Sequence, residues 1–395
     1  MMNNSTTRRW LERMLQRYLL PSLALVYVIS AFFPQFGIWL RTQSITGGKD
    51  FGFGHINAVN LLLAGLLFNT GLAVPLKELL CLTRHPKLVA LGLSIRITSS
   101  LIIILLAMMG GLLFSGTVWN SILLGLILIA VMPVANSSAG WTHHSDANVG
   151  LSMWLILSSV LLSPLLVPGL LDLSSQFVSA EIVEDYRRMA GGYAGSFVMM
   201  WVIIPAVLGV LFRTVFIKTY GPKLKLTVKV MTSLFLLILN YINGSVSLPS
   251  LLNGEQNGLI LLVGFSASVS CGLLFAAAGL VSKICRLTKR DRLAVMYSTA
   301  MSNTGVALVL ATTVSPELVV VHLMVIFYTL IQHIIAGVID ELVVIGTKNK
   351  PHSLNKPCTM TNQPVLNDLE DRPTTQTGSQ AATYEGEVIT SKGSI

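Results

Sequence analysis

Two long apolar stretches of this chain are each interrupted by a short patch of small and polar residues. The patches are residues 133–140, PVANSSAG, and residues 298–305, STAMSNTG. The core of a bilayer holds no water to hydrogen-bond loose backbone, so an interrupted helix is stable there only where protein or a hydrated cavity receives the freed groups. A matched pair of interruptions in the two halves of a chain points to a binding site near the middle of the membrane.

The composition places the chain in a bilayer. Of its 395 residues 53% are hydrophobic and 11% are charged, and the mean hydropathy is +0.70, whereas about 25% of a typical soluble domain is charged. A membrane-spanning helix needs roughly 20 apolar residues. Ten stretches meet this need, near residues 18–40, 55–75, 87–114, 118–144, 147–171, 192–216, 226–248, 258–283, 291–313 and 315–346.

The ten predicted spans divide into two halves of five. Corresponding starts in the two halves are offset by about 170 residues, which is typical of an internal structural repeat. Because five is odd, the second half enters the membrane from the opposite side. The sequence thus predicts an all-α membrane protein with ten transmembrane helices in two inverted five-helix repeats, with broken crossing helices in spans four and nine.

The distribution of lysine and arginine predicts the orientation. With the N-terminus in the cytoplasm, nearly all of these residues fall on the cytoplasmic side, and only Arg41, Lys49, Arg187 and Arg188 fall outside. Positive charge gathers on the cytoplasmic side of membrane proteins, so we expect both termini there. The net charge of +9 is explained by this topology, and we expect no nucleic-acid partner.

The predicted organisation has five parts. They are a cytoplasmic N-terminal segment (1–17), the first five-span repeat (18–171), an external connector (172–191), the second five-span repeat (192–346) and a disordered cytoplasmic tail (347–395) rich in polar residues. The four cysteines, Cys81, Cys271, Cys285 and Cys358, lack metal-ligand spacing and are expected to be free thiols.

Arg96 is the charged residue that most needs an explanation. It lies about nine residues into the third span, near 14 Å deep at about 1.5 Å per residue. An arginine near the centre of a bilayer costs on the order of 3 kcal/mol on insertion scales, so it should face a cavity or a polar partner. The alternative is that its side chain reaches the nearer headgroups. For the polar patches, the alternative to a binding site is a kinked helix repaired by its own hydroxyl groups.

A second polar group lies after the fourth span. His143, His144 and Asp146 suggest a metal or acyl-transfer site, but neighbouring helical histidines point about 100° apart and no further ligand is suitably spaced. A turn between spans explains them better, and we expect no enzyme and no cofactor. His333, Asp340 and Glu341 near the end of the tenth span are candidates either for proton relay or for a solvated interface.

Several motifs together resemble the bile acid:sodium symporter family. They are the break in residues 132–140, the run Asp146–Ser152, the sequence LLSPLL at 161–166, His85-Pro86-Lys87 before the third span, and MSNTG at 301–305. The resemblance implies ten spans arranged as a panel domain and a core domain. It also implies sodium ions at the crossed, broken helices, an organic anion bound between the domains, and alternating access.

The sodium ligands of that family are only partly present. By the resemblance Ser138 and Ser152 match oxygen ligands, whereas Ala139 stands for an asparagine and Ile156 for a threonine. In the ninth span Ser298 replaces an acidic residue and Ser302 a glutamine, and Arg96 replaces a glutamine of the third span. A site that loses a carboxylate and gains a guanidinium should not hold two sodium ions. We therefore expect Arg96 to act as a tethered cation bonded to Ser298, Ser302 and exposed carbonyls, or to hold a substrate carboxylate.

The sequence therefore predicts a secondary transporter of a small organic anion, embedded in the cell or inner membrane. The expected binding residues are Arg96, Asn136, Ser137, Ser138, Ser152, Ser298, Ser302, Asn303 and Thr304. Open alternatives are a related permease for a metalloid or another small solute, which usually carries a cysteine in the fourth-span break, and a membrane sensor that does not transport. The sequence does not indicate an oligomeric state.

Overall fold

The computed structural model describes residues 4–45, 56–73, 86–113, 116–176, 178, 180–194, 196–216, 221–249 and 257–348. These fall in one compact unit, Met1–Ser353, and the second unit, Leu354–Ile395, lies outside them. Thr347 and Lys348, the first two residues of the expected disordered tail, are helical. The rest of that tail, with Cys358, lies outside the described residues, as do Lys77, Cys81 and Arg84. Of the other two cysteines, Cys271 is buried, Cys285 is exposed, and both are free thiols.

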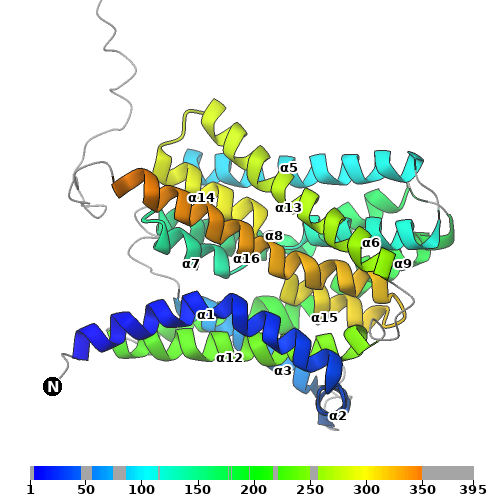
Figure 1. Cartoon of the computed structure of the whole chain (residues 1–395), viewed down its shortest axis with the longest axis horizontal. Helices are drawn as coiled ribbons and strands as arrows, with labels where there is room; N and C mark the ends of the chain where they lie inside the picture. Colours follow the sequence, from blue (N-terminus) through cyan, green and yellow to red (C-terminus); the bar gives the residue numbers. More distant parts are fainter. Residues whose placement is uncertain are drawn as a thin grey trace, which may run out of the picture. The chain divides into compact units, whose positions relative to one another are not determined.

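The described chain is almost entirely helical (Figure 1). The N-terminal half contains α1 (Asn4–Phe32), α2 (Gln35–Thr42), α3 (Ala58–Ala73), α5 (Pro86–Leu113), α6 (Thr117–Val131), α7 (Ser137–His144), α8 (Val149–Ser175) and α9 (Ala180–Ala194). The C-terminal half contains α10 (Ser196–Val198), a π-helical turn (Met199–Ile203), α11 (Ile204–Phe216), α12 (Pro222–Ser247), α13 (Asn257–Ile284), α14 (Lys289–Ala300), α15 (Thr304–Val314) and α16 (Val319–Lys348). A short antiparallel ladder joins β1 (Ser44–Ile45) to β2 (Ile56–Asn57).

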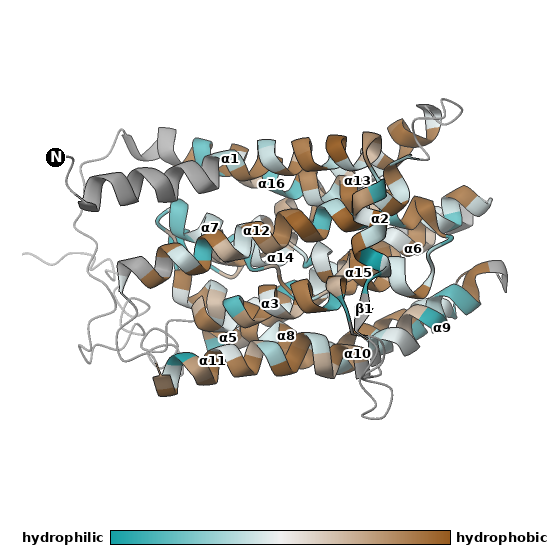
Figure 2. Ribbon diagram, turned by 90° about the horizontal axis from the view of Figure 1, so that it is seen from below, coloured by the Kyte–Doolittle hydropathy of each residue, from teal (hydrophilic) through white to brown (hydrophobic). Residues whose placement is uncertain are grey.

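The helices include several that are long and apolar enough to cross a membrane. Among the described residues six meet the test alone: Pro86–Gly110, Val149–Ser175, Met199–Phe216, Leu226–Ser247, Gly258–Ile284 and Val319–Val343. Many large apolar side chains on them are exposed, such as Leu105, Leu165 and Leu261, and Figure 2 shows brown, hydrophobic residues along the long helices. An apolar exterior of this kind suits contact with lipid. The protein is an integral, multi-pass membrane protein.

The first predicted span is not a single straight helix. Tyr18–Phe32 and Gln35–Thr42 are bent by 90° relative to one another. Pro34 lies at the bend, directly before α2. Because a proline ring disfavours helical geometry in the residue before it and removes one backbone donor, the helix stops and restarts there. The apolar run continues through this bend, so the hydropathy pattern does not reveal it.

Two groups of helices position the two polar patches. In one group α3 packs against α11 and α12, and α12 packs against α1; in the other, α5 packs against α6, α8 and α13, and α16 packs against α6, α13 and α15. Figure 1 shows α1, α3 and α12 in the lower part of the view and α5, α13, α14 and α16 above them. Helix α15 contacts both groups, because it packs against α3 and α12 as well as α16.

Several helix starts are defined by local side-chain caps. Asn148 accepts a hydrogen bond from the backbone N–H of Leu151 at 3.0 Å, and Asn303 accepts one from Val306 at 3.2 Å. Thr288 accepts from Asp291 at 3.2 Å. Asparagine and threonine are favoured at this position because they satisfy donors that the first helical turn leaves free. These caps begin α8, α15 and α14.

Candidate functional site

The two polar patches cross one another as short extended segments. Helix α6 ends at Val131 and α7 begins at Ser137, while α14 ends at Ala300 and α15 begins at Thr304. Between these ends, Val134 and Ser302 form an antiparallel bridge. We call this feature, residues 132–136 and 301–303, the crossover. Both interruptions lie in the patches that the sequence singles out.

Backbone hydrogen bonds of the crossover run from one segment to the other. The N–H of Ala135 donates to the carbonyl of Met301 at 2.8 Å, and the N–H of Asn303 donates to that of Pro133 at 2.8 Å. The N–H of Val134 donates to the hydroxyl of Ser159 at 3.0 Å. These three N–H groups are thus satisfied by protein, as the bilayer requires, and each break provides acceptors for the other.

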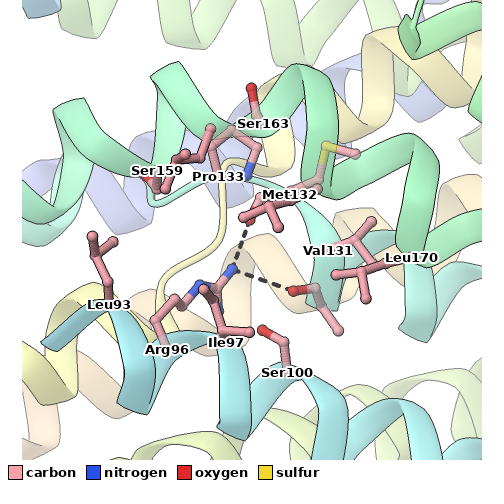
Figure 3. A pocket seen from close by; sticks show the side chains of 13 residues that line it. Leu93, Arg96, Ile97, Ser100, Val131, Met132, Pro133, Ser159, Ser163 and Leu170 are labelled. Atoms are coloured by element: carbon pink, nitrogen blue, oxygen red, sulfur yellow. Dashed lines mark hydrogen bonds between the residues drawn. The ribbon is translucent and has the colours of Figure 1, made fainter. Parts of the chain in front are cut away.

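Arg96 binds both sides of the crossover. Its residue is 5% exposed, so the side chain does not extend to the headgroups. One guanidinium nitrogen donates to the carbonyl of Met132 at 2.7 Å and the hydroxyl of Ser302 at 3.0 Å, with a longer contact of 3.4 Å to the carbonyl of Ala130. The other donates to the carbonyl of Thr299. Figure 3 shows the side chain directed at the end of α6, with dashed lines for its hydrogen bonds to the carbonyls of Ala130 and Met132.

The carbonyls bonded to Arg96 belong to the ends of two helices. Ala130 is in the last turn of α6 and Thr299 in the last turn of α14, so the guanidinium lies between two helix C-termini. A helix C-terminus carries roughly half a negative charge and favours a cation. Across the described residues, no carboxylate forms an ion pair with Arg96. The positive charge is therefore stabilised by carbonyl oxygens and helix dipoles.

A chain of serine hydroxyls lies beside the guanidinium. Ser138 is 3.3 Å from Ser152, and Ser152 is 3.1 Å from Ser298, measured between hydroxyl oxygens. All three are buried. Of the two predicted serine partners of Arg96, Ser302 contacts it, whereas Ser298 bonds to Ser152 instead. Helices α7, α8 and α14 thus meet at these three hydroxyl groups.

The residues at this position do not fit a sodium ion. Sodium needs several oxygen ligands and compensating negative charge, as hard cations do in general. Here the carbonyls of Met132 and Thr299 and the hydroxyl of Ser302 are already bonded to a guanidinium. Within the described ranges, no group of three or more histidine, cysteine, aspartate or glutamate residues gathers that could hold a metal ion.

The second halves of the two broken helices, α7 and α15, begin near α3 and α16. The side-chain amide of Asn136, before α7, donates to the hydroxyl of Thr70 on α3. The amide of Gln332 on α16 donates to the hydroxyl of Thr304, the first residue of α15, at 3.5 Å. The amide oxygens of Asn136 and Gln332 are buried and have no hydrogen-bond partner among the described residues. Two helix N-termini with unused polar atoms thus face the junction of the two helix groups.

A small cavity adjoins the other side of Arg96. Its volume is about 30 Å³, enough for about one water molecule. Figure 3 labels Ser100, Ser159 and Ser163 around it. A space of this size holds no organic substrate.

His143 and His144, which were predicted to lie in a turn between two spans, are helical in the structure. His143 and His144 are the last residues of α7. The Nδ1 atom of His144 is 2.5 Å from a carboxylate oxygen of Asp340 on α16. Asp340 is 3% exposed and His333 is also 3% exposed, so a solvated interface does not describe either of them. His144 therefore pairs with the tenth predicted span, which the spacing of the motif does not reveal.

Some contributors to this region carry no sequence signal. The carbonyls of Ala130, Met132 and Thr299 belong to ordinary apolar or small residues. Ser159 and Thr70 look like any hydroxyl in an apolar helix. Among Arg96 and its partners, the charged residue within an apolar stretch is what the sequence reveals. Its partners are backbone carbonyls or side chains that are distant in the sequence.

Comparison with known proteins supports the motif resemblance. Residues 60–253 match the model of the sodium bile acid symporter family. The uncharacterized protein YbaS of Bacillus subtilis (strain 168) is 29% identical over 237 residues, which cover 58% of this chain and 70% of that protein. The uncharacterized sodium-dependent transporter YocS of the same organism is 24% identical over 286 residues, covering 70% of this chain and 81% of that protein.

Proposed function

The resemblance to the sodium bile acid symporter family is confirmed over residues 60–253, and on that premise we propose that the chain is a secondary transporter that moves an organic anion by alternating access without sodium. The single observation that carries this proposal is the position of Arg96. Its guanidinium lies between the C-terminal ends of α6 and α14 and bonds to both. In broken-helix carriers, such ends and unwound carbonyls coordinate the coupling cation.

The proposal includes ten spans in two inverted repeats, with both termini in the cytoplasm. Three shorter apolar helices, Ala58–Ala73, Thr117–Val131 and Thr304–Val314, accompany the six long ones and the bent pair α1 and α2. When α6 is joined with α7 and α14 with α15, each pair makes one broken span. This grouping yields the number of spans that the hydropathy pattern predicts, and it supports the repeat.

Arg96 is proposed to be a tethered cation. A covalently attached guanidinium occupies its site whatever the sodium gradient, so the carrier loses sodium as a driving force. It then works as a uniporter or an exchanger, or it couples to another ion. The arginine also holds the two breaks together, as a bound metal ion does for its ligands.

Sodium independence is the first test. In proteoliposomes that contain the purified full chain, uptake of an organic anion should be equal in external sodium, potassium or choline, because no free cation site remains. The anion is chosen as the carboxylate or sulfonate that most raises the melting temperature of the protein, since a ligand stabilises the state that binds it. Uptake that requires sodium, in both the natural chain and Arg96→Gln, contradicts the tethered cation.

The substrate is proposed to bind at the N-termini of α7 and α15. Each helix start carries the positive end of a helix dipole, which favours an anion. Asn136 and Ser137 are partly exposed there. A small anion between these two starts also meets α3, through Thr70, and α16, through Gln332.

Asn136→Asp tests this position without disturbing the helix. The substitution keeps the size of the side chain and removes the hydrogen bond to Thr70, while the positive end of the helix dipole favours the new charge, so we expect the protein to fold. Anion uptake should nevertheless fall by at least about tenfold, because a like charge at about 4 Å costs on the order of several kcal/mol near a protein surface. Asn57→Asp is the matched control, because the Asn57 side chain caps α3 by accepting from the N–H of Asn60 at 2.8 Å. Equal uptake by Asn136→Asp and the natural chain contradicts the proposed anion site.

A further inference from the structure

The end of α7 that lies away from the crossover is bound to α16 by a buried acid and a histidine. His144 Nδ1 lies 2.5 Å from Asp340 Oδ2. The hydroxyl of Ser145 donates to Asp340 Oδ1 at 2.6 Å. Because that hydroxyl has given its hydrogen to the acid, the hydroxyl of Tyr297 on α14 donates to Ser145, over 2.8 Å. Both carboxylate oxygens are thus bonded, and three helices meet at one acid.

The two partners differ in their access to water. The side chain of Asp340 is 5% exposed, whereas that of His144 is 42% exposed. Asp340 also lies in one of the six long apolar helices, Val319–Val343. A carboxylate removed from water is costly unless it is paired and hydrogen-bonded. The half-exposed imidazole supplies that pairing and connects the acid to solvent.

We propose that His144 and Asp340 together form a proton-binding site, and that α7 transmits its occupancy to the crossover. The imidazole takes a proton from water at Nε2 while Nδ1–H stays directed at the carboxylate. With the proton bound, the pair is an imidazolium and a carboxylate with no net charge. When the proton returns to water, a single buried negative charge remains.

Loss of the proton acts on α7 through electrostatics. Ser145 is the C-terminal cap of α7, so the negative end of the helix dipole faces the carboxylate. An imidazolium in the last turn is favourable for that dipole, whereas an unpaired carboxylate is not. Deprotonation therefore weakens the attachment of α7 to α16.

Other ionisable groups lie on or next to the helices that form the pair's surroundings. They are His143 on α7, Asp146 in the following turn, Tyr297 and Arg290 on α14, and Glu341 on α16. The side chain of Arg290 donates to the carbonyl of Asp146 at 3.0 Å. None of these groups replaces the direct contact between His144 and Asp340.

Helix α7 is short enough to act as a rigid link. Its eight residues span about 12 Å, from the histidine pair to the start of the helix beside Asn136. It packs against α8, α14 and α16 along this length. A displacement at His144 therefore reaches the N-terminal end of α7, where we place the substrate. On that proposed function, the bound proton is the coupling ion that replaces sodium.

The fluorescence of Trp141 reports the proton directly. The Trp141 and His144 rings are 6.3 Å apart, measured between their centroids, and a protonated imidazole quenches a neighbouring indole. In purified full-length protein, the emission of Trp141 is obtained by subtracting that of Trp141→Phe and is followed against pH. We expect a single titration, absent from His144→Gln and unchanged in His143→Gln, the control at the neighbouring histidine.

Two variants move the titration in opposite directions. Asp340→Asn should lower its midpoint by about one to three pH units, because an opposite charge in contact favours the charged imidazole. Ser145→Ala should raise it, since the carboxylate loses one donor and binds the shared proton more tightly. If Asp340→Asn does not fold, Ser145→Ala still decides the point. A midpoint that neither variant moves overturns the proton-binding site.

Transmission along α7 is tested by thiol labelling. Asn136→Cys is placed in a chain whose four native cysteines are replaced by serine, and the maleimide labelling rate is measured above and below the fluorescence midpoint, relative to a free thiol at each pH. We expect the relative rate to differ by about tenfold, as for an ordinary coupling between sites, and not to differ in the Asp340→Asn or His144→Gln background. A relative rate independent of pH overturns the transmission. Neither measurement uses transport, so a failure of the uptake experiment leaves these results standing.

Discussion

Replacing Arg96 with alanine is expected to lower the free energy of unfolding by about 3 kcal/mol or more, because each buried acceptor left without a donor costs about 1–3 kcal/mol. The guanidinium serves acceptors of both breaks, at Met132 and at Thr299 and Ser302. Its loss leaves these groups in an interior that water reaches poorly. Denaturant titration in detergent micelles measures the change. The matched control is Arg187→Ala, at an exposed arginine of α9, which should change the stability by less than about 0.5 kcal/mol.

Arg96→Lys separates the charge from its geometry. An ammonium keeps the positive charge between the two helix ends, but it is a point donor and lacks the planar fork of a guanidinium. We expect this variant to fold with part of the lost stability restored, while anion uptake falls because the two breaks are no longer held in register. A stability equal to that of Arg96→Ala shows that the charge itself contributes little. Full uptake by Arg96→Ala contradicts any role for this residue in the carrier.

The second large effect is expected at the contact between α3 and α11. A side chain added at Gly71 overlaps the carbonyl of Ala206, and one added at Gly209 overlaps the carbonyl of Phe68. These overlaps involve backbone, so the two helices must separate. We expect Gly209→Val to lower the free energy of unfolding by about 3 kcal/mol or more, at or beyond the upper end of ordinary overpacking.

Gly272 provides the control for this substitution. It lies within α13, and a side chain added there meets nothing within 4 Å. Gly272→Ala should raise the stability slightly, by about 0.5–1 kcal/mol, because alanine favours a helix over glycine. Chemical denaturation of the three proteins under one detergent condition gives the comparison. A Gly209→Val variant as stable as the natural chain shows that α3 and α11 do not depend on this close approach.

The membrane class and the helix breaks are readable from sequence because both follow from local chemistry. A run of apolar residues predicts a helix in lipid regardless of its neighbours, and the six long helices lie close to their predicted ranges. Pro133 and the small polar residues after it interrupt α6 and α7 for reasons that lie within the segment. The bend at Pro34 was equally local, but the apolar run concealed it.

The partners of the polar residues are not local. Thr299 lies 203 positions from Arg96 and Met132 lies 36 positions away. Both contribute backbone carbonyls, which every residue has and which no residue type marks in the sequence. For the same reason the pairing of Ser298 with Ser152 in place of Arg96 could not be foreseen. His144 was predicted to lie in a turn between two spans. Its pairing with Asp340 could not be predicted, because Asp340 lies 196 positions later and no spacing rule connects the two residues.

The sequence by itself determined that this protein spans a membrane, that two of its spans break at the polar patches, and that one arginine must be accommodated inside. Each of these follows from the free energy of moving residues out of water, which depends on residue type and order alone. Only the tertiary structure decided that the arginine bonds to two helix C-termini and that an acid of α16 meets a histidine of α7. Contacts of this kind depend on how distant segments pack, because the groups concerned gain their interaction energy only when the fold brings them within a few ångströms.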